Sequence, residues 1–267
     1  NEYGYNDDLR FIEAGGCISG ADPSQVSEQA KKRQLDEMGT LGSGNHYLEI
    51  QEVVEIYDKE AAAAFGIETG DIKISIHCGS RGLGHQIGTD FLKRMATEAK
   101  KHGLELPERE LACAPLNSPV GKSYLGAMRS GINCALANRQ ILTHLVRQVF
   151  EKTAPQASIR LLYDVSHNTC QAEQHTVGGK QRRLFVHRKG ATPAAQDELG
   201  VIPGTMADPG YIVVGLGNEE SLNSSSHGAG RPRSRTASKQ LITRHQRDVY
   251  LRQRGVELLN PDAGVDE

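Results

Sequence analysis

Residues 72–84 read IKISIHCGSRGLG, a pattern that predicts a strand followed by a glycine-rich turn. The isoleucines at 72, 74 and 76 alternate with polar residues, which predicts a strand ending at His77. Three glycines then predict a turn. Apolar residues from Ile87 to Ala99 recur at helical spacing, so we expect an amphipathic helix that stops at Gly103.

The other elements are predicted from capping and periodicity. Asp22-Pro23, followed by Gln25, is typical of a helix start and predicts a helix over residues 22–37. Further expected elements are an extended stretch at 47–56, helices at 122–152 and 234–255, and strands at 159–165, 184–187 and 211–214. Because helices and strands mix without a strict βαβ alternation, we predict an α+β fold.

The composition is that of an ordinary globular protein. The 267 residues are 37% hydrophobic and 24% charged, with a formal net charge of -2, so any contact with nucleic acid must come from local patches. We find no apolar run of membrane-spanning length and no signal-peptide pattern. The five cysteines form no CxxC pair. This usage predicts a reducing, cytoplasmic location.

Four of the ten histidines lie in glycine- or asparagine-rich turns at the expected element ends: His46, His77, His167 and His227. Neutral imidazole is a common ligand of transition metals. A single histidine in such a place is more often structural or incidental. Four in the same context favour a metal or catalytic site.

Several familiar motifs fail when their spacing is checked. Gly121-Lys122-Ser123 resembles the end of a P-loop, but the required first glycine would fall at Leu116. His77-Cys78 followed by Arg81 has too short a spacing for a phosphatase loop. The sequence has no HExxH, GxSxG or CxxC motif. A kinase, a P-loop NTPase, a zincin and an α/β-hydrolase are therefore disfavoured.

Positive charge gathers in two short stretches. The first holds Lys180, Arg182, Arg183, Arg188 and Lys189, and the second holds Arg231, Arg233, Arg235, Lys239, Arg244 and Arg247. Such runs are usually solvated faces. Beside a histidine in a glycine turn they favour phosphate contacts, because arginine forks fit phosphate oxygens.

Six segments in fixed order resemble the RtcB family of RNA ligases. They are LGSGNHYLE at 41–49, HCGSRGLG at 77–84, YDVSHN at 163–168, HRKG at 187–190, GLGNEES at 215–221 and HGAGR at 227–231. Any one segment is a weak signal, and the ordered set is specific. The resemblance covers nearly the whole chain and corresponds to the central portion of the family.

The resemblance implies a mixed α+β fold, with β-sheets and flanking helices around one pocket for GTP or GMP and two Mn²⁺ ions. It implies metal ligation by His46, His77 and His167, and formation of a histidine–GMP intermediate at His227. Positions that it aligns with the guanylate site are Asn45, Glu49, Asn168, Gly204, Thr205, Met206, Gly228, Ala229 and Gly230. Positions that it aligns with RNA phosphates are Arg81, Arg231 and Arg235.

The implied reaction is GTP-dependent joining of RNA 3′-phosphate or 2′,3′-cyclic phosphate ends to 5′-hydroxyl ends, in RNA repair or tRNA splicing. An archease-like activator would be a family partner. No membrane partner is expected.

Some family features have no counterpart here. The family's Asp–Cys metal motif lies upstream of the GNH segment, and a guanylate-contacting lysine lies near the family's C-terminus. We therefore expect residues 1–267 to form a single catalytic domain that is incomplete at both ends, and the activity of this chain alone is left open. Gly210 stands where the family has a serine that contacts GMP.

Two other functions remain open at this stage. The first is a nucleotide- or RNA-binding remnant that has lost catalysis, which the missing motif and Gly210 favour. The second is a metal-dependent phosphoesterase that uses the same histidines to activate water. The RNA substrate and the oligomeric state do not follow from the sequence.

Overall fold

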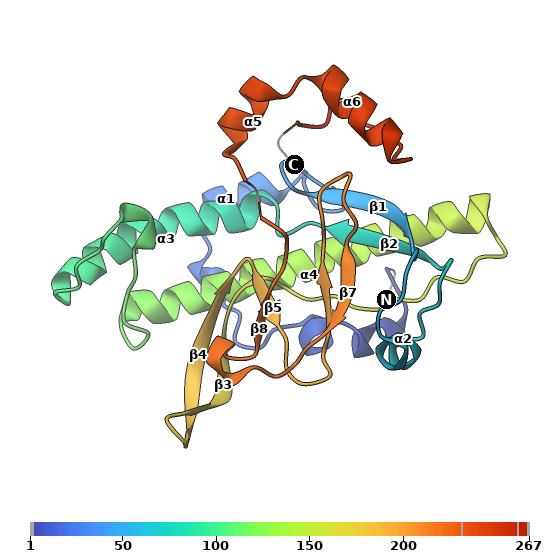
Figure 1. Ribbon diagram of the computed structural model, residues 1–267. Coiled ribbons are helices and arrows are strands. Elements are labelled where there is room, and N and C mark those ends of the chain that lie inside the picture. Colours follow the sequence, from blue (N-terminus) through green and yellow to red (C-terminus); the bar gives the residue numbers. More distant parts are fainter. Residues whose placement is uncertain (1–2, 231, 261, 266–267) are drawn as a thin grey trace. The chain divides into compact units, whose positions relative to one another are not determined.

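The computed structural model describes residues 3–230, 232–260 and 262–265 (Figure 1). Their contacts group the chain into two compact units. The first unit comprises Asn1–Tyr57 and Ile67–Thr169, and the second comprises Asp58–Gly66 and Cys170–Glu267.

The first unit combines short 3-10 turns, three α-helices and one two-stranded sheet within the described residues. Its elements are η1 (Asn6–Arg10), η2 (Glu13–Gly16), η3 (Pro23–Gln25), α1 (Glu28–Gln34), β1 (Tyr47–Glu52), β2 (Ile72–His77), α3 (Gly82–Lys101), η4 (Arg109–Leu111) and α4 (Pro119–Thr153). The strand at 72–77 and the helices predicted around 87–99 and 122–152 are confirmed. The extended stretch at 47–56 is confirmed over β1.

The core of this unit lies among its helices, with α3 and α4 side by side (Figure 1) and α1 packed on α3. Phe91 is 2% exposed and packs with Ile87 and Ala127. These apolar residues follow the helical spacing of the sequence, so burial of one face of each helix holds the layer together.

The glycine turn after His77 is fixed by side chains at and just after the end of α1, and by one of its own serines. The Gly82 N–H donates to Glu37 Oε2 at 2.5 Å, and the Leu83 N–H donates to Gln34 Oε1 at 3.2 Å. The Gly84 N–H donates to Ser80 Oγ at 3.1 Å. The first N–H groups of a helix have no partner within it. These bonds satisfy them and anchor the turn.

Strands β1 and β2 are antiparallel, with Tyr47 opposite His77. On β1 the polar side chains Tyr47 and Glu49 are half-buried, whereas Leu48 and Ile50 are 40% and 62% exposed. The sheet therefore turns its polar face inward, and this is the face that carries His77.

Two predictions for this unit are wrong in part. Asp22 caps only the single turn η3, and Ser27 caps α1, so the helix predicted over 22–37 begins later. The strand predicted at 159–165 does not form. Its only ladder contact within the described residues is an isolated bridge between Ile12 and Asp164.

The second unit contains one short helix from the earlier part of the chain, three two-stranded sheets and two C-terminal helices in its described part. Its elements are α2 (Lys59–Phe65), β3 (Asn168–Val177, which begins in the first unit), β4 (Lys180–Lys189), β5 (Ala191–Pro193), β6 (Leu199–Ile202), β7 (Tyr211–Val214), η5 (Glu219–Ser221), β8 (Ser224–Ser226), α5 (Arg235–Leu241) and α6 (Arg244–Gln253). The strands predicted at 184–187 and 211–214 are confirmed. Strand β3 was not predicted.

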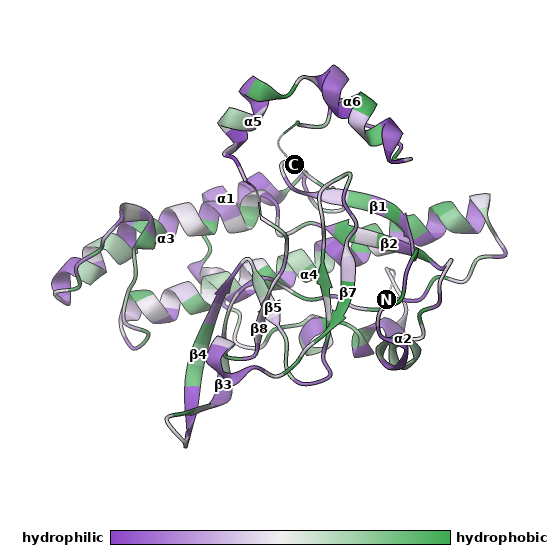
Figure 2. Cartoon of the chain, viewed as in Figure 1, coloured by the Kyte–Doolittle hydropathy of each residue, from purple (hydrophilic) through white to green (hydrophobic). Residues whose placement is uncertain are grey.

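Pairing in this unit joins β3 to β4, β5 to β8, and β6 to β7. Gly178 and Gly179 connect β3 to β4 with φ of 59° and 73°, a backbone that glycine adopts without strain. Figure 2 shows β4 as hydrophilic at both ends and hydrophobic between them.

The arginine-rich tail is helical, as expected, but it forms two helices. The break falls at Ile242, and Thr243 caps α6 in a capping box with Gln246. Arg247 is only 6% exposed and is paired with Asp248 at 2.7 Å. The suggested phosphate contact is therefore wrong for Arg247, which is buried and paired.

The α+β fold class is confirmed by this mixture of helices and small sheets. Of the helices in the described ranges, none has both the length and the apolar character needed to cross a bilayer.

A buried ion pair ties the N-terminal segment to α4. The Arg147 guanidinium donates to both oxygens of Asp8, at 2.6 and 2.8 Å. The side chains of Arg147 and Asp8 are only 4% and 5% exposed. The bonds from Arg147 hold the pKa of Asp8 below its usual value of 3.8. A carboxyl with a lowered pKa stabilises the fold above its unfolded pKa, and this contribution is lost as the pH falls through the folded pKa.

We predict that Asp8→Asn lowers the free energy of unfolding by about 3–5 kcal/mol near neutral pH, because it leaves Arg147 buried without its anion. The loss should shrink at acid pH, below the lowered folded pKa of Asp8, where the wild-type carboxyl is protonated. Urea denaturation at both pH values measures this. Asp7→Asn is the matched control, since the Asp7–Arg10 pair is 82% and 73% exposed and should change stability by less than about 1 kcal/mol. Equal effects of the two substitutions would contradict the assignment.

Candidate functional site

The four histidines singled out in the sequence all lie at the ends of strands. His46 immediately precedes β1, His77 ends β2, His167 precedes β3 and His227 follows β8. Chain segments at strand ends hold side chains on a rigid frame while leaving room for a ligand.

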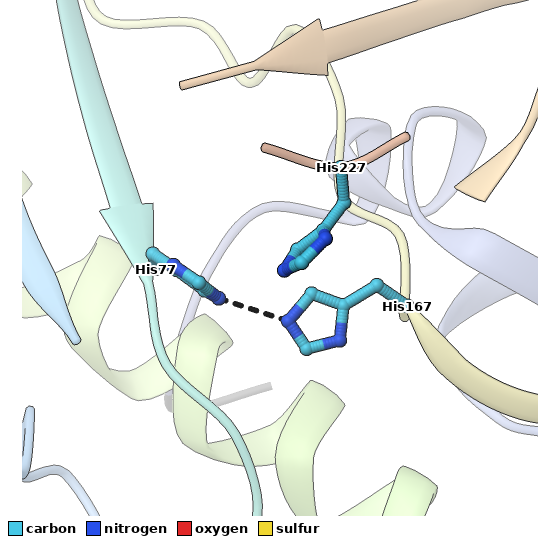
Figure 3. Close-up of side chains that lie close together, drawn as sticks. All are labelled: His77, His167 and His227. Atoms are coloured by element: carbon cyan, nitrogen blue, oxygen red, sulfur yellow. Dashed lines mark hydrogen bonds between the residues drawn. The ribbon is translucent and has the colours of Figure 1, made fainter. Parts of the chain in front are cut away.

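His77 and His167 face each other within the first unit. Their Nε2 atoms are 2.8 Å apart, and the rings meet edge to face at 89° (Figure 3). A neutral imidazole carries only one N–H, so two Nε2 atoms this close must share a proton or turn their lone pairs toward one cation. Two imidazole nitrogens in this arrangement fit the donor set of a transition metal.

His46 lies beside this pair, with its ring centre 5.9 Å from that of His77. The His46 Nδ1 lies 2.9 Å from the Leu41 carbonyl. A carbonyl oxygen can only accept a hydrogen bond, so Nδ1 carries the proton and Nε2 keeps a lone pair. Burial lowers the pKa of His46, and the charge of Arg81 lowers it further, against the opposing bond to Leu41. These effects favour the neutral, metal-binding form.

Arg81 is held over the glycine-rich segment that precedes His46. Its Nε donates to Thr40 Oγ1 at 3.1 Å. A Cβ at Gly42 would lie 1.9 Å from the guanidinium, so the close approach requires glycine there. Arg81 itself has φ of 53°, in the left-handed region that is costly for a residue with a side chain.

The polar face of β1 adds a carboxyl group to this area. Burial raises the pKa of Glu49, and a bond from Gln51 at 2.8 Å opposes this shift. Asn45 and Asn168, the other guanylate-site positions in this unit, are exposed at the starts of β1 and β3.

His227 belongs to the second unit and is positioned by the β5–β8 pair. Ala191 pairs with Ser226, so Gly190 and His227 are brought together just beyond the ladder. The His227 Nδ1 lies 2.8 Å from the Gly190 carbonyl. This bond again assigns the proton to Nδ1 and the lone pair to Nε2. His227 is the third side chain drawn in Figure 3.

The remaining predicted positions of this unit lie in loops and at a helix start. Gly204, Thr205 and Met206 begin the connection between β6 and β7, where Thr205 Oγ1 donates to Asp208 at 2.7 Å. Gly228, Ala229 and Gly230 follow His227, and Arg235 is the first residue of α5. Arg231 lies outside the described residues.

Arg188 does not have the phosphate contact suggested by its sequence neighbours. It is 2% exposed, donates to Glu173 at 2.5 and 3.0 Å, and donates through Nε to Ser224 at 2.9 Å. The charge of Arg188 is therefore paired with the carboxylate of Glu173 inside the protein. Lys180, Arg182, Arg183 and Lys189 on the same strand are exposed.

Sequence reasoning found the histidines but missed the groups that orient them. His46 and His227 are oriented by the backbone carbonyls of Leu41 and Gly190. Every residue has such a carbonyl, so no side-chain pattern in the sequence could indicate these two. Tyr47, whose ring meets His77 edge to face at 5.4 Å between centres, was equally unmarked.

The fold and these side chains define an α+β protein with paired imidazoles suited to a metal ion and a further oriented histidine. The chain belongs to the RtcB family: residues 1–267 match the family model described as "tRNA-splicing ligase RtcB".

Curated relatives with the same description come from several archaea. The Archaeoglobus fulgidus protein is 44% identical over 96% of this chain and 57% of its own length. The Methanococcus maripaludis protein is 42% identical over 99% of this chain and 59% of its own length. The Pyrobaculum aerophilum protein is 43% identical over 98% of this chain and 59% of its own length. The chain thus spans less than two thirds of the length of these relatives.

The backbone of Arg81 yields a prediction about stability. Arg81→Gly removes the strain of the positive φ, whereas Arg81→Ala keeps it, and both lose the bond to Thr40. We expect the glycine variant to be more stable than the alanine variant by about 1 kcal/mol, after allowance for the greater freedom of glycine in the unfolded chain. Urea denaturation of the two variants decides the sign. An alanine variant as stable as the glycine variant would show that the backbone stores no strain here.

Proposed function

We propose that this protein takes part in sealing RNA 3′-phosphate or 2′,3′-cyclic phosphate ends to 5′-hydroxyl ends, with GTP as the energy source and Mn²⁺ as the metal. The observation that carries the proposal is the family match over all 267 residues, because the matched segments hold every histidine of the candidate site. The names of the relatives support RNA as the substrate.

We propose His46, His77 and His167 as metal ligands. The facing Nε2 atoms of His77 and His167, 2.8 Å apart, and the Nε2 lone pair of His46 support this role. A divalent cation held there would offset the negative charge of a triphosphate. The protein's own part is to orient His46, because the Leu41 carbonyl holds its proton at Nδ1, and to bring the Nε2 atoms of His77 and His167 face to face.

His227 is the proposed nucleophile. Its Nδ1 proton is held by the Gly190 carbonyl, so Nε2 can attack the α-phosphorus of GTP. The new N–P bond forms as the bond to pyrophosphate breaks. A 2′,3′-cyclic phosphate end is first opened by water, which breaks the bond to O2′ and leaves a 3′-phosphate. GMP then passes from the histidine to the RNA 3′-phosphate. Attack by the 5′-hydroxyl on this activated phosphate forms the RNA linkage and releases GMP.

The other positions that the family resemblance marks have proposed binding roles. The guanylate would contact Asn45, Glu49, Asn168, the loop at 204–206 and the glycine-rich segment at 228–230. RNA phosphates would contact Arg81, Arg231 and Arg235. We further propose that residues 1–267 act as one catalytic domain in the cytoplasm, and that an archease-like activator assists it.

Labelled GTP tests this assignment. The chain, extended at both ends by the matching segments of the Archaeoglobus fulgidus relative, is incubated with Mn²⁺ and GTP labelled at the α-phosphate. We expect a covalent GMP adduct that survives base and is lost in acid. His227→Ala should abolish it, because no other oriented lone pair is proposed for attack. His187→Ala, which alters an exposed histidine of β4, should keep the adduct.

Each other outcome identifies a different function. Release of phosphate without an adduct would indicate a phosphoesterase, and binding without either reaction would indicate a non-catalytic remnant. An adduct that persists in His227→Ala would reject His227 as the nucleophile.

Gly210 provides a second test of the guanylate site. A Cβ added there would be 3.5 Å from its nearest neighbour, Pro203 Cα, and the φ of Gly210 is outside the left-handed region. A serine therefore fits. If it donates to the guanylate phosphate, Gly210→Ser should improve GMP binding by about 0.5–1.5 kcal/mol, a several-fold change in Kd. Calorimetry with GMP measures this.

Gly204 is the control position in the same loop. A Cβ there would lie 2.5 Å from the Asp208 carbonyl oxygen, so Gly204→Ser should distort the loop and weaken GMP binding. Unchanged or weaker binding by Gly210→Ser would remove Gly210 from the proposed guanylate site.

A further inference from the structure

Two adjacent residues in the middle of α4, Asn138 and Arg139, bond to three separate loops. Asn138 has no exposed surface and Arg139 is 9% exposed. Neither residue lies in the six short segments quoted from the sequence, and neither is within the proposed set of ligands. Their partners all lie in the first unit.

Asn138 joins the loop before His46 to the loop after His77. Its Oδ1 accepts from the Gly39 N–H at 2.6 Å, and its Nδ2 donates to the carbonyls of Thr40 at 3.1 Å and Gly79 at 3.2 Å. Two carbonyls on one side and an N–H on the other fix which end of the amide carries the nitrogen. Both N–H groups and the oxygen of the side chain are used.

Arg139 extends this connection to the loop before His167. Its Nε donates to Asp164 Oδ1 at 2.5 Å, and one terminal nitrogen donates to the Cys78 carbonyl at 3.3 Å. Cys78 directly follows His77, and Asp164 is three residues before His167. One helix therefore bonds to the loop that precedes His46, to the residues that follow His77 and to the loop that precedes His167.

The bonds to the first loop lead directly to the orientation of His46. The Thr40 carbonyl, held by Asn138, is followed by the Leu41 carbonyl, which accepts from His46 Nδ1. The two peptide groups share the Leu41 Cα, so a displacement of the first also displaces the second. Asn138 thus helps to hold the carbonyl that orients His46.

We infer that Asn138 and Arg139 are positioning residues that set the relative places of His46, His77 and His167, and through them the affinity for a divalent metal ion. This inference rests on the proposed metal-binding role of those histidines. Groups that orient metal ligands commonly change metal affinity by about 10–100-fold when they are removed.

The same helix provides a matched control. Asn133 also uses both ends of its amide on one loop, accepting from the Ile18 N–H at 2.7 Å and donating to the Ile18 carbonyl at 3.0 Å. That loop carries none of the three histidines. Asn133→Ala thus removes an equivalent set of bonds from α4 without touching the chain next to them.

The test titrates the 267-residue chain and its variants with Co²⁺, which binds imidazole sites more tightly than Mn²⁺ and absorbs visible light when bound. We expect Asn138→Ala to weaken Co²⁺ binding by about 10–100-fold and Asn133→Ala to stay within about twofold of wild type. Hydrogen exchange of the Gly39 amide, measured without metal, should become faster in Asn138→Ala alone. Equal Co²⁺ affinity in both variants, or unchanged exchange at Gly39, would overturn the inference.

A second variant covers the case in which Asn138→Ala fails to fold. Arg139→Lys keeps the charge beside Asp164 but lacks the fork that also reaches the Cys78 carbonyl. It should still weaken Co²⁺ binding by about threefold or more, and an affinity equal to wild type would contradict the inference.

These outcomes separate the inference from the ligase proposal. Absence of a GMP adduct rejects the ligase chemistry without affecting the Co²⁺ comparison. If the wild-type chain binds no Co²⁺, the metal site is rejected, and the exchange rate at Gly39 alone decides whether Asn138 holds the loops.

Discussion

A carbonyl oxygen can accept a hydrogen bond but never donate one, and the candidate site depends on this simple constraint. A histidine has two ring nitrogens that could each carry the proton. At His46 and His227 a backbone carbonyl decides between them, at 2.9 and 2.8 Å. The same nitrogen, Nε2, is left with its lone pair in both cases. For His46 that lone pair suits a metal, and for His227 it suits attack on phosphorus. The two proposed roles thus rest on one kind of local bond.

Because backbone carbonyls orient these histidines, the geometry of the site depends on how the backbone of its loops is held. A carbonyl can orient an imidazole only if its own loop is held still, and loops have no ladder of their own to hold them. In the first unit this support comes largely from helices. Gln34 of α1 and Glu37 in the turn after it bind the amides at the start of α3, and Asn138 of α4 binds the loops at 39–40 and 79. The helices of this unit are therefore more than a scaffold for burial, because their polar side chains complete the hydrogen bonds of the site loops.

Elements with strong local signals could be predicted, and those that depend on distant partners could not. The alternating isoleucines predict the strand β2, and the helical spacing of apolar residues predicts α3 and α4. The apolar run at 159–165 has strand-like composition, yet a strand needs a partner edge, and the N-terminal segment offers only the bridge at Ile12. Strand β3, in contrast, contains glutamine, glutamate and histidine, a polar composition that does not predict a strand. It forms because Gly178 and Gly179 fold it against β4.

The difference between local signals and distant partners also explains which parts of the site could be predicted. Histidines beside glycines are visible in a sequence, and their places at strand ends follow from the turns. Charge is less informative, because an arginine can serve a ligand or the interior. Arg188 and Arg247 belong to basic runs but are buried against Glu173 and Asp248. Arg81, in contrast, takes a left-handed backbone and stays half-buried beside His46. A residue kept in a costly conformation next to a neutral imidazole is hard to explain by stability alone, since glycine would satisfy the backbone better. The cost is understandable if the positive charge itself is needed there, as it would be for a site that binds phosphates.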